Sequence, residues 1–193
     1  MSGRERSRPT IQEARRFAAL IEPHLDALFR AAYRLCRSVP DAEDLVQDVC
    51  LRVYDRRGQL ERADSPRAWL LRVQLNLHID AAWRRRAVAE PLDDERHGAR
   101  PLPGPDEQGP EEHAEAARLA EMLNRGWRLL TPDQQALLAL YAEGYSLAEM
   151  IEITGVPLGA LKARLHRARA RLGSLLDADR QPPRIAAVSG ESR

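Results

Sequence analysis

Apolar residues recur every three or four positions along most of the chain, which is typical of amphipathic α-helices. Ala, Leu, Arg and Glu dominate the composition and favour helices, whereas runs of Val, Ile, Tyr or Thr that would indicate strands are few. We therefore predict an all-α protein. In the first part of the chain the helical spacing joins Phe17, Leu20, Ile21, Leu25, Leu28, Ala32 and Leu35.

The next helix is predicted from its start signals. Pro40 is expected to end the first helical region. Asp41 can then cap a new helix that runs to Asp55, with Asp44 at its third position in a capping-box-like arrangement. On that helix one face is apolar and buried, and the opposite face is mostly acidic.

A third long helix is predicted after a loop. The segment RRGQLERAD, residues 56–64, lacks helical periodicity and is expected to be irregular. Ser65 and Pro66 follow it and form a good start signal, because a hydroxyl can cap the helix and proline is tolerated in its first turn. These helices make up a first predicted domain, residues 11–86.

The second half of the chain contains clear capping patterns. Residues 111–130 form one helical run with acidic residues at its front. Thr131 starts the next helix, with Gln134 placed to close a capping box, and Gly144 stops it.

A short capped helix and a longer one follow. Ser146 and Glu149 form another capping box, and this short helix ends at Thr154 and Gly155. The stretch GALKARLHRARARL, residues 159–172, comes directly afterwards. A short helix, a turn with glycine and a second helix are the pattern of a helix-turn-helix. We predict a second domain over residues 112–176.

Between these blocks the composition changes. Residues 87–115 contain nine acidic residues against two arginines, a net charge of −7. Proline removes backbone donors and glycine costs conformational entropy, so we predict a flexible linker over residues 87–111. Residues 177–193 are predicted to be a loose tail. The prolines and glycines of the linker are Pro91, Pro101, Pro103, Pro105, Pro110, Gly98, Gly104 and Gly109.

Charge is unevenly distributed, although the formal net charge of the whole chain is only +1. Residues 157–173 contain five basic residues and no acidic one, so the near-zero total reflects cancellation between segments. On a helical wheel one narrow stripe of this last helix is apolar and should pack against the preceding helices. That stripe consists of Leu158, Leu161, Leu165, Ala168 and Leu172.

The opposite side of the same helix suits a DNA groove. Small residues allow a helix to approach base edges, while basic residues at both margins can reach the phosphates. The alternative is an ordinary solvated helix, but such a helix usually mixes Glu with Arg along its face. The candidate DNA-binding residues are Gly159, Ala160, Lys162, Ala163, Arg164, His166, Arg167, Arg169 and Arg171, with His166 central among them.

These motifs resemble a known family. The spacing S-x-x-E followed by GVPLGALKARLHRARARL resembles region 4 of bacterial sigma factors of the extracytoplasmic-function (ECF) group. The segments DAEDLVQDVCLRVY and RAWLLRVQLNLHID, with a basic cluster after them, resemble region 2 of the same group. The two resemblances cover roughly residues 17–86 and 115–175. They imply a factor without cofactor or catalytic residues that binds core RNA polymerase, opens the −10 element and reads the −35 element of promoter DNA. They also imply an anti-sigma factor as a partner.

The resemblance assigns a docking role to the second helix. It implies that the acidic face binds the clamp helices of the polymerase large subunit, through Asp44, Gln47, Asp48 and Leu51. An acidic patch around an exposed leucine is a plausible protein-docking surface. The alternative is an acidic helix front that only complements the helix dipole. That alternative explains Asp44 but neither Asp48 nor Leu51.

The resemblance also assigns the −10 element to the first domain. In the family, the third helix and the loop before it capture unstacked bases, and cations hold the backbone. We expect the loop over 57–65 to hold a flipped base, whereas Trp69 has core spacing. The candidate −10 residues are Arg57, Gly58, Gln59, Asn76, Asp80, Arg84, Arg85 and Arg86.

Several positions depart from the family pattern. Ala160 and Ala163 stand where the family often has hydroxyl residues, which removes two potential contacts to the −35 element. Gln74 and Trp83 replace residues that are frequent in the third helix. These departures imply an atypical promoter preference. The acidic linker is either a phosphate mimic for a polymerase channel or a solubilising tether.

Two other functions are alternatives to that of a sigma factor. A helix-turn-helix regulator that acts without polymerase would leave the first domain unexplained. A metal-dependent enzyme could use Asp41, Glu43, Asp44 and Asp48 as oxygen ligands, but the five histidines are scattered.

Bulk features favour a cytoplasmic location. No apolar run approaches the roughly 20 residues of a membrane span, and the N-terminus lacks the apolar segment of a signal peptide. We expect no membrane insertion. Cys36 and Cys50 lie in apolar helical patterns and are expected to be small buried hydrophobes, with a redox pair as the alternative.

Overall fold

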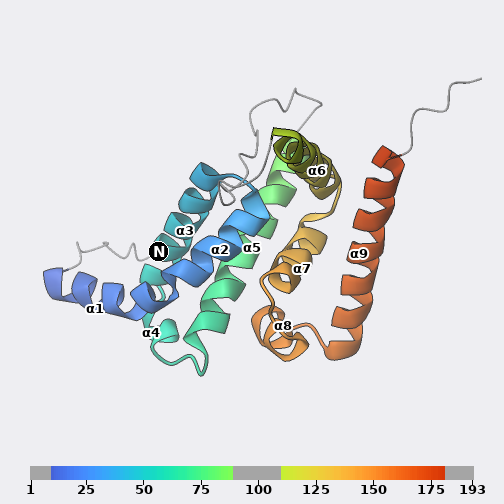
Figure 1. Cartoon of the computed structure of the whole chain (residues 1–193). Coiled ribbons are helices and arrows are strands. Elements are labelled where there is room, and N and C mark those ends of the chain that lie inside the picture. Colours follow the sequence, from blue (N-terminus) through green and yellow to red (C-terminus); the bar gives the residue numbers. More distant parts are fainter. Residues whose placement is uncertain (1–9, 89–109, 181–193) are drawn as a thin grey trace, which may run out of the picture.

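The computed structural model describes residues 10–88 and 110–180, and every regular element in these ranges is helical (Figure 1). The all-α prediction is confirmed. Most of the predicted linker and tail lie outside the described residues. The elements are α1 (Ile11–Ile21), the 3-10 helix η1 (Glu22–His24), α2 (Leu25–Cys36), α3 (Val39–Tyr54), α4 (Arg57–Leu60), α5 (Pro66–Val88), α6 (Pro110–Arg128), α7 (Pro132–Ala142), α8 (Leu147–Thr154) and α9 (Leu158–Arg180).

The start of α3 differs from the prediction. Ser38, not Asp41, is the N-cap, and its hydroxyl accepts a hydrogen bond from the Asp41 backbone N–H at 3.5 Å. Pro40 lies in the first turn, where its missing N–H costs nothing, so it does not end the preceding helix. That helix ends instead at Arg37, which has a left-handed backbone with φ of 58°.

Two further boundaries were wrong. The predicted loop over 56–64 contains the short helix α4, which packs between α3 and α5. The last helix continues to Arg180, so the start of the predicted tail is helical. The Ser65-Pro66 start signal is confirmed, because α5 begins at Pro66 and the Ser65 hydroxyl accepts from the Ala68 N–H at 3.4 Å.

The capping patterns of the second half are confirmed. Thr131 and Gln134 form a reciprocal capping box at the start of α7, and Ser146 and Glu149 do so at α8. Gly144 follows α7 with a positive φ of 82°, a conformation that glycine adopts without strain. These local signals therefore set the helix boundaries directly.

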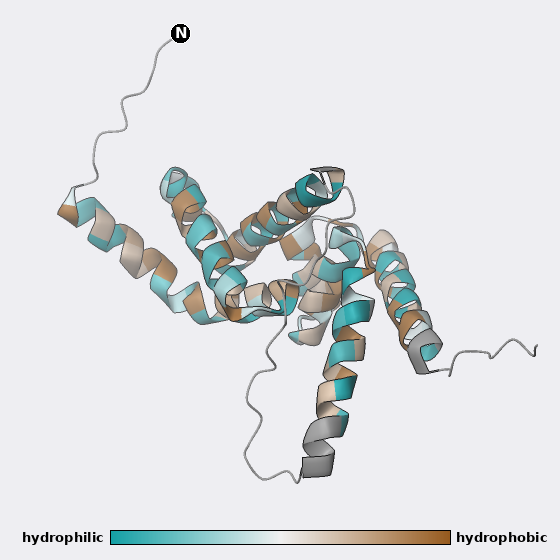
Figure 2. Ribbon diagram, turned by 90° about the horizontal axis from the view of Figure 1, so that it is seen from above, coloured by the Kyte–Doolittle hydropathy of each residue, from teal (hydrophilic) through white to brown (hydrophobic). Residues whose placement is uncertain are grey.

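The helices before and after residues 89–109 pack against each other. Helix α7 lies against both α2 and α5, and α8 lies against α5 (Figure 1). One buried cluster includes Leu28 and Leu71 from the first set and Leu140 and Ile153 from the second. Hydrophilic and hydrophobic residues are both found on the helices around this core (Figure 2). Trp69 is partly buried and packs against it, in agreement with its core spacing.

Three polar side chains are buried where α2, α5 and α7 meet. Gln74 donates a hydrogen bond from Nε2 to the Leu28 carbonyl at 3.0 Å. His78 is 6% exposed and faces Gln135 of α7, which is also buried. Among the described residues, neither Gln74 Oε1 nor His78 Nε2 has a hydrogen-bond partner. Burial, and secondarily the charge of Arg85, lower the pKa of His78 to about 4.

This depressed pKa predicts a pH-dependent stability. The folded state holds His78 neutral, whereas the unfolded chain binds a proton below pH of about 6.5. The free energy of unfolding is therefore highest above that pH, and it falls as the pH drops toward the folded-state pKa of about 4. Between pH 7.5 and 5.5 we expect the free energy of unfolding to fall by roughly 1 kcal/mol because of this residue. Urea denaturation at the two pH values measures the change.

His78→Gln is the matched control, because it retains a polar side chain that does not titrate. The pKa of His24 is also lowered, chiefly by burial, so a smaller dependence should remain in this variant. An equal loss of stability in both proteins would contradict the assignment to His78.

Candidate polymerase and promoter interfaces

The helix-turn-helix is built by α8, the turn after it, and α9. Gly155 closes α8 with φ of 71°, and its N–H donates to the Ile151 carbonyl at 2.7 Å. The Thr154 hydroxyl donates to the Met150 carbonyl and accepts from the Val156 N–H, which stiffens the turn. The predicted short helix, glycine turn and second helix are therefore present.

The apolar stripe of α9 is mostly as predicted. Leu161, Leu165 and Ala168 are buried, and Leu172 is half-buried against α6. Leu158 departs from the prediction, since it is 45% exposed. It is the first residue of the helix, and side chains in a helix lean toward its N-terminus, so this leucine extends past the end of the packed face.

The opposite face of α9 is open. All nine candidate DNA-binding residues of this helix are exposed, and α9 packs only its other side on α6, α7 and α8. Arg169 lies over the ring of Tyr141 at 5.1 Å, which directs one cation along the margin of the face. In Figure 1, α9 lies at the side of the molecule away from α3.

The acidic face of α3 is also exposed. Asp44, Gln47 and Asp48 point away from the core, and Leu51 on the same face is 65% exposed. The other face holds Val49 and Val53, which are completely buried. A leucine this exposed buries little apolar area within the described part of the fold, so this face suits a binding partner better than a role in the helix front alone.

The candidate −10 residues come from two helices, α4 and α5. Asn76, Asp80 and Arg84 are exposed along α5. Gln59 is exposed and Gly58 is half-buried on α4.

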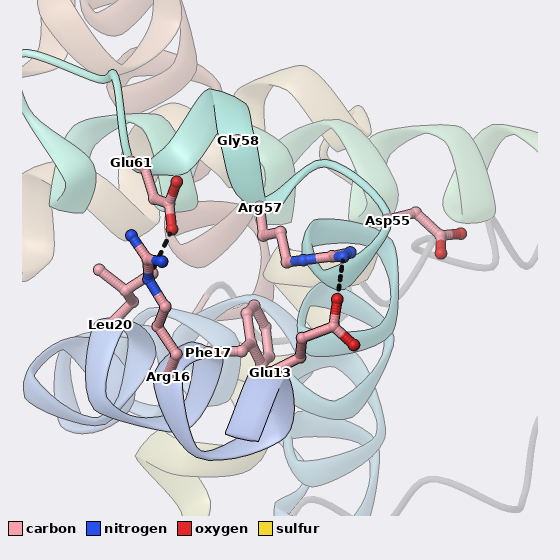
Figure 3. Close-up of a pocket in the computed structure, with 8 residues that line it drawn as sticks. All are labelled: Glu13, Arg16, Phe17, Leu20, Asp55, Arg57, Gly58 and Glu61. Atoms are coloured by element: carbon pink, nitrogen blue, oxygen red, sulfur yellow. Dashed lines mark hydrogen bonds and ion pairs between the residues drawn. The ribbon is translucent and has the colours of Figure 1, made fainter. Parts of the chain in front are cut away.

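Arg57 is engaged within the first set of helices. Its guanidinium lies 5.0 Å from the ring of Tyr54 and donates to the Glu13 carboxylate at 3.3 Å and to the Tyr54 carbonyl at 3.2 Å. Arg16 of α1 pairs with Glu61 at 3.3 Å in the same way. Figure 3 shows these pairs across an open hollow of about 390 Å³ between α1 and α4.

Arg86, also a candidate for the −10 element, contacts the second set of helices. Its Nη2 donates to the Arg128 carbonyl at 3.1 Å and to the Leu130 carbonyl. Trp83 next to it donates from Nε1 to the Asp133 carboxylate at 3.3 Å, and Arg86 lies over the Trp83 ring at 5.8 Å.

Sequence reasoning missed the residues that join the two sets of helices. Arg30 and Arg34 of α2 both pair with Glu143, and Arg72 of α5 reaches the end of α8. These partners are 80 to 113 positions apart in the chain, so no local pattern identifies them. Arg34 and Arg72 are exposed in helices with a buried face, where sequence alone suggests an ordinary solvated cation.

The geometry of the described residues does not support the two alternative chemistries, a metal-dependent enzyme and a redox pair of cysteines. Within residues 10–87 and 115–177, no group of three His, Cys, Asp or Glu side chains could hold a metal ion. Burial raises the pKa of Cys36 to about 12 and also raises that of Cys50, which makes both thiols poor nucleophiles. No helix in the described part of the chain is long and apolar enough to cross a bilayer.

Comparison with known families decides the identity. A family model described as Sigma-70 region 2 matches residues 20–88, and one described as Sigma-70, region 4 matches residues 127–172. The RNA polymerase sigma-E factor of Streptomyces coelicolor is 33% identical over 162 residues, which cover 83% of this chain and 85% of that protein. The chain belongs to the ECF sigma factors. Sigma factors direct RNA polymerase to promoters and are not enzymes.

Other relatives agree. The ECF RNA polymerase sigma factor SigE of Mycolicibacterium smegmatis is 34% identical over 161 residues, which cover 81% of this chain and 60% of that longer protein. The sigma factor RpoE of Bartonella quintana, solved in complex with the anti-sigma factor NepR, has a TM-score of 0.60 at 26% identity and covers 86% of this chain and 99% of its own. CnrH, solved with the cytosolic domain of CnrY, has a TM-score of 0.54 at 28% identity and covers 86% of this chain and 90% of its own.

In this sigma factor, region 2 therefore comprises α2 to α5, and region 4 comprises the end of α6 to α9. The exposed acidic face lies in region 2 and the exposed basic face in region 4. The prediction of the family from two motifs in this order is confirmed.

The turn of the helix-turn-helix generates a stability prediction. Gly155→Ala places a side chain on a left-handed backbone, so we expect the free energy of unfolding to fall by about 1 kcal/mol. Gly159→Ala is the control, because a Cβ there meets no heavy atom within 4 Å and the backbone is helical. Thermal denaturation of the two variants should show the first destabilised and the second equal to or above wild type. The reverse order would show that the turn is not held in this conformation.

Proposed function

We propose a division of promoter recognition and polymerase docking between named surfaces of this sigma factor. The observation that carries the proposal is the separation of two exposed faces of opposite charge, the acidic one on α3 and the basic one on α9 (Figure 1). A surface that binds the phosphates of a DNA duplex needs cations, whereas a surface that binds a basic protein needs carboxylates. The domain bounds that we propose are 11–86 and 112–176.

Helix α9 enters the major groove of the −35 element. Its exposed arginines and Lys162 reach phosphates on both sides, since they flank a strip of small residues on the wheel. His166 is central on this strip and is the side chain that we assign to base discrimination. Ala160 and Ala163 leave few other polar groups for bases, so affinity here depends strongly on phosphates.

The face of α3 binds core RNA polymerase. Leu51 supplies an exposed apolar centre, and Asp44, Gln47 and Asp48 surround it with acceptors. A small apolar centre with a polar rim is the common anatomy of protein interfaces.

The −10 element binds along α4 and α5. Asn76 and Asp80 offer polar groups for an unstacked base, and Arg84 and Arg85 offer cations for its backbone. Arg57, Gly58 and Gln59 are assigned to the flipped base, and Arg86 joins the backbone contacts.

An anti-sigma factor regulates the protein. Two similar solved structures, those of RpoE and CnrH, are described as complexes with NepR and with the cytosolic domain of CnrY. Because polymerase and promoters are cytoplasmic in bacteria, we place this chain in the cytoplasm.

Substitutions on the two faces should have different effects. Arg167→Ala combined with Arg171→Ala should weaken binding of polymerase holoenzyme to promoter duplex. The salt slope should fall by about one for each phosphate that the variant no longer neutralises. Asp48→Ala should instead weaken the affinity for core polymerase. Fluorescence anisotropy over a salt series measures the first, and titration of labelled protein with core enzyme measures the second.

Transcription from a promoter selected by the wild-type holoenzyme is the functional readout. Glu115→Ala, on the exposed side of α6, is the matched control for removal of one acidic side chain and should leave polymerase affinity unchanged. If both classes of substitution impaired the same step, the division of surfaces would be wrong. Duplex binding without polymerase-dependent initiation would favour a simple helix-turn-helix regulator.

A further inference from the structure

Helix α4 is a single short turn, although the proposed function assigns Arg57, Gly58 and Gln59 on it to the captured base. A helix this short is not stable by itself in water, so its surroundings must hold it in place. Leu60, which is 1% exposed, anchors its inner side in the core. Arg62 donates from Nε to the Gly58 carbonyl at 2.7 Å. The two ends of α4 are held by side chains of α1.

Glu13 of α1 holds the side chain at the start of α4. Its Oε1 accepts a hydrogen bond from Arg57 Nη2 at 3.3 Å. Its other oxygen, Oε2, accepts from the Thr10 N–H at 2.9 Å and from the Thr10 hydroxyl at 3.0 Å. These hydrogen bonds from Thr10, and to a lesser extent the charge of Arg57, lower the pKa of Glu13, so its carboxylate is ionised at neutral pH. One carboxylate therefore joins the start of α1 to the start of α4.

The guanidinium of Arg57 is held on a second side by Tyr54. Nη1 donates to the Tyr54 carbonyl at 3.2 Å, and the guanidinium lies 5.0 Å from the centre of the Tyr54 ring. Phe17 of α1 packs edge-on against that ring, with centroids 5.1 Å apart and an interplanar angle of 82°. A cation over an aromatic ring and a charge-assisted hydrogen bond each favour one orientation of the guanidinium. Arg57 therefore acts on a base by placing α4 and not as a free cation.

The residue after the end of α4 is held from α1 as well. Arg16 pairs with Glu61 at 3.3 Å, so α1 reaches both ends of the turn, and Gln59 between them is exposed. The hollow of about 390 Å³ separates the two helices here, and the ion pairs cross it (Figure 3). The family model of region 2 begins at residue 20, so Glu13 and Arg16 lie outside it. These contacts are therefore additional to the part of the chain that the model matches.

We propose that α1 is a brace for α4 and that Glu13, acting through Arg57, is a positioning residue for capture of the −10 base. The inference rests on the proposed function, which assigns α4 to this base. Without the brace α4 samples other orientations, and the apparent affinity for the base falls with the fraction of molecules in which the turn is correctly placed. Both ion pairs are exposed and contribute little to global stability, so variants that lack one should remain folded.

The test compares three variants in which one Glu is replaced by Gln. Glu13→Gln keeps a side chain that can close the capping box of α1 but removes the charge that holds Arg57. Glu61→Gln removes the charge that holds Arg16. Glu22→Gln, at an exposed position directly after α1, is the control, because Glu22 takes part in neither contact. Circular dichroism establishes that each variant is folded.

Each variant is assembled with core polymerase, and the purified holoenzyme is titrated with a labelled oligonucleotide. The oligonucleotide is the non-template strand of the −10 element from a promoter that the wild-type holoenzyme selects. Glu13→Gln should bind it roughly fivefold more weakly than wild type and Glu61→Gln roughly threefold, whereas Glu22→Gln should bind like wild type.

The direction of the change separates the brace from a simple charge effect. Removal of a carboxylate makes the protein more positive, so electrostatics alone predicts tighter binding of DNA by all three variants. The brace predicts weaker binding by Glu13→Gln and Glu61→Gln. Wild-type or tighter binding by either of these two variants would overturn the brace.

A series of strands that each lack one base separates positioning from a general loss of structure. The affinity difference between wild type and Glu13→Gln should disappear when the base captured by α4 is replaced by an abasic site, and it should persist when another base is removed. A difference that persists at every abasic position would show that Glu13 supports only the fold, and it would remove the positioning role.

Gln59→Ala distinguishes failure of the brace from failure of the proposed function. This variant leaves both ion pairs in place and removes an exposed side chain of α4. If it weakens binding of the −10 strand while Glu13→Gln does not, the −10 assignment of α4 stands and only the brace is wrong. If Gln59→Ala has no effect on binding, the −10 assignment of α4 fails and the brace fails with it.

Discussion

The unpaired carbonyls at the C-terminal ends of α6 and α8 determine how the two halves of this molecule meet. Every helix leaves its last carbonyls without intrahelical partners, and a buried carbonyl without a partner is costly. Here Arg72 donates to two carbonyls at the end of α8, and Arg86 donates to the Arg128 carbonyl at the end of α6 and to the Leu130 carbonyl just after it. The two arginines are about four turns apart on α5. The contact fixes both the position and the direction of region 4, because the free carbonyls of a helix project only from its C-terminal end.

Helix α5 can play this role because it is packed on several sides. It contacts α2, α3, α7 and α8, and its buried positions include Leu71 and Leu75 as well as the polar Gln74 and His78. A polar residue inside such a contact needs partners, and Gln74 finds one in the Leu28 carbonyl. Polar groups in this position make the packing specific but weaker than an apolar core of the same area.

Much of the fold could be predicted from the sequence, because its information is local. The capping boxes at Thr131 and Ser146 each involve residues three positions apart, and both were predicted correctly. The predicted start of α3 was wrong because two residues, Ser38 and Asp41, are both good N-cap residues. Ser38 is the cap because proline fits the first turn better than it fits the residue before a helix.

The candidate surfaces were predicted only in part, for a different physical reason. The exposed faces of α3 and α9 follow from helical periodicity, since burial of one stripe determines which side remains open. Arg86 was assigned to DNA from its place in a basic cluster, but its position in this structure is set by carbonyls more than 40 residues away. Sequence periodicity shows which residues are exposed on their own helix and does not show which other helix will cover them.

The distribution of charge explains why α9 faces outward. Region 2 contributes arginines to the contact between the two regions. Region 4 contributes their acceptors, which are the Glu143 carboxylate, the Tyr145 hydroxyl and backbone carbonyls. The five basic residues of segment 157–173 would repel those arginines if this part of α9 faced region 2. Packing α9 on α6, α7 and α8 places its cations on the far side. The electrostatic preference that joins the two regions therefore leaves the basic helix exposed for binding to a DNA duplex, while Arg67, Arg72 and Arg86 of α5 are engaged with region 4.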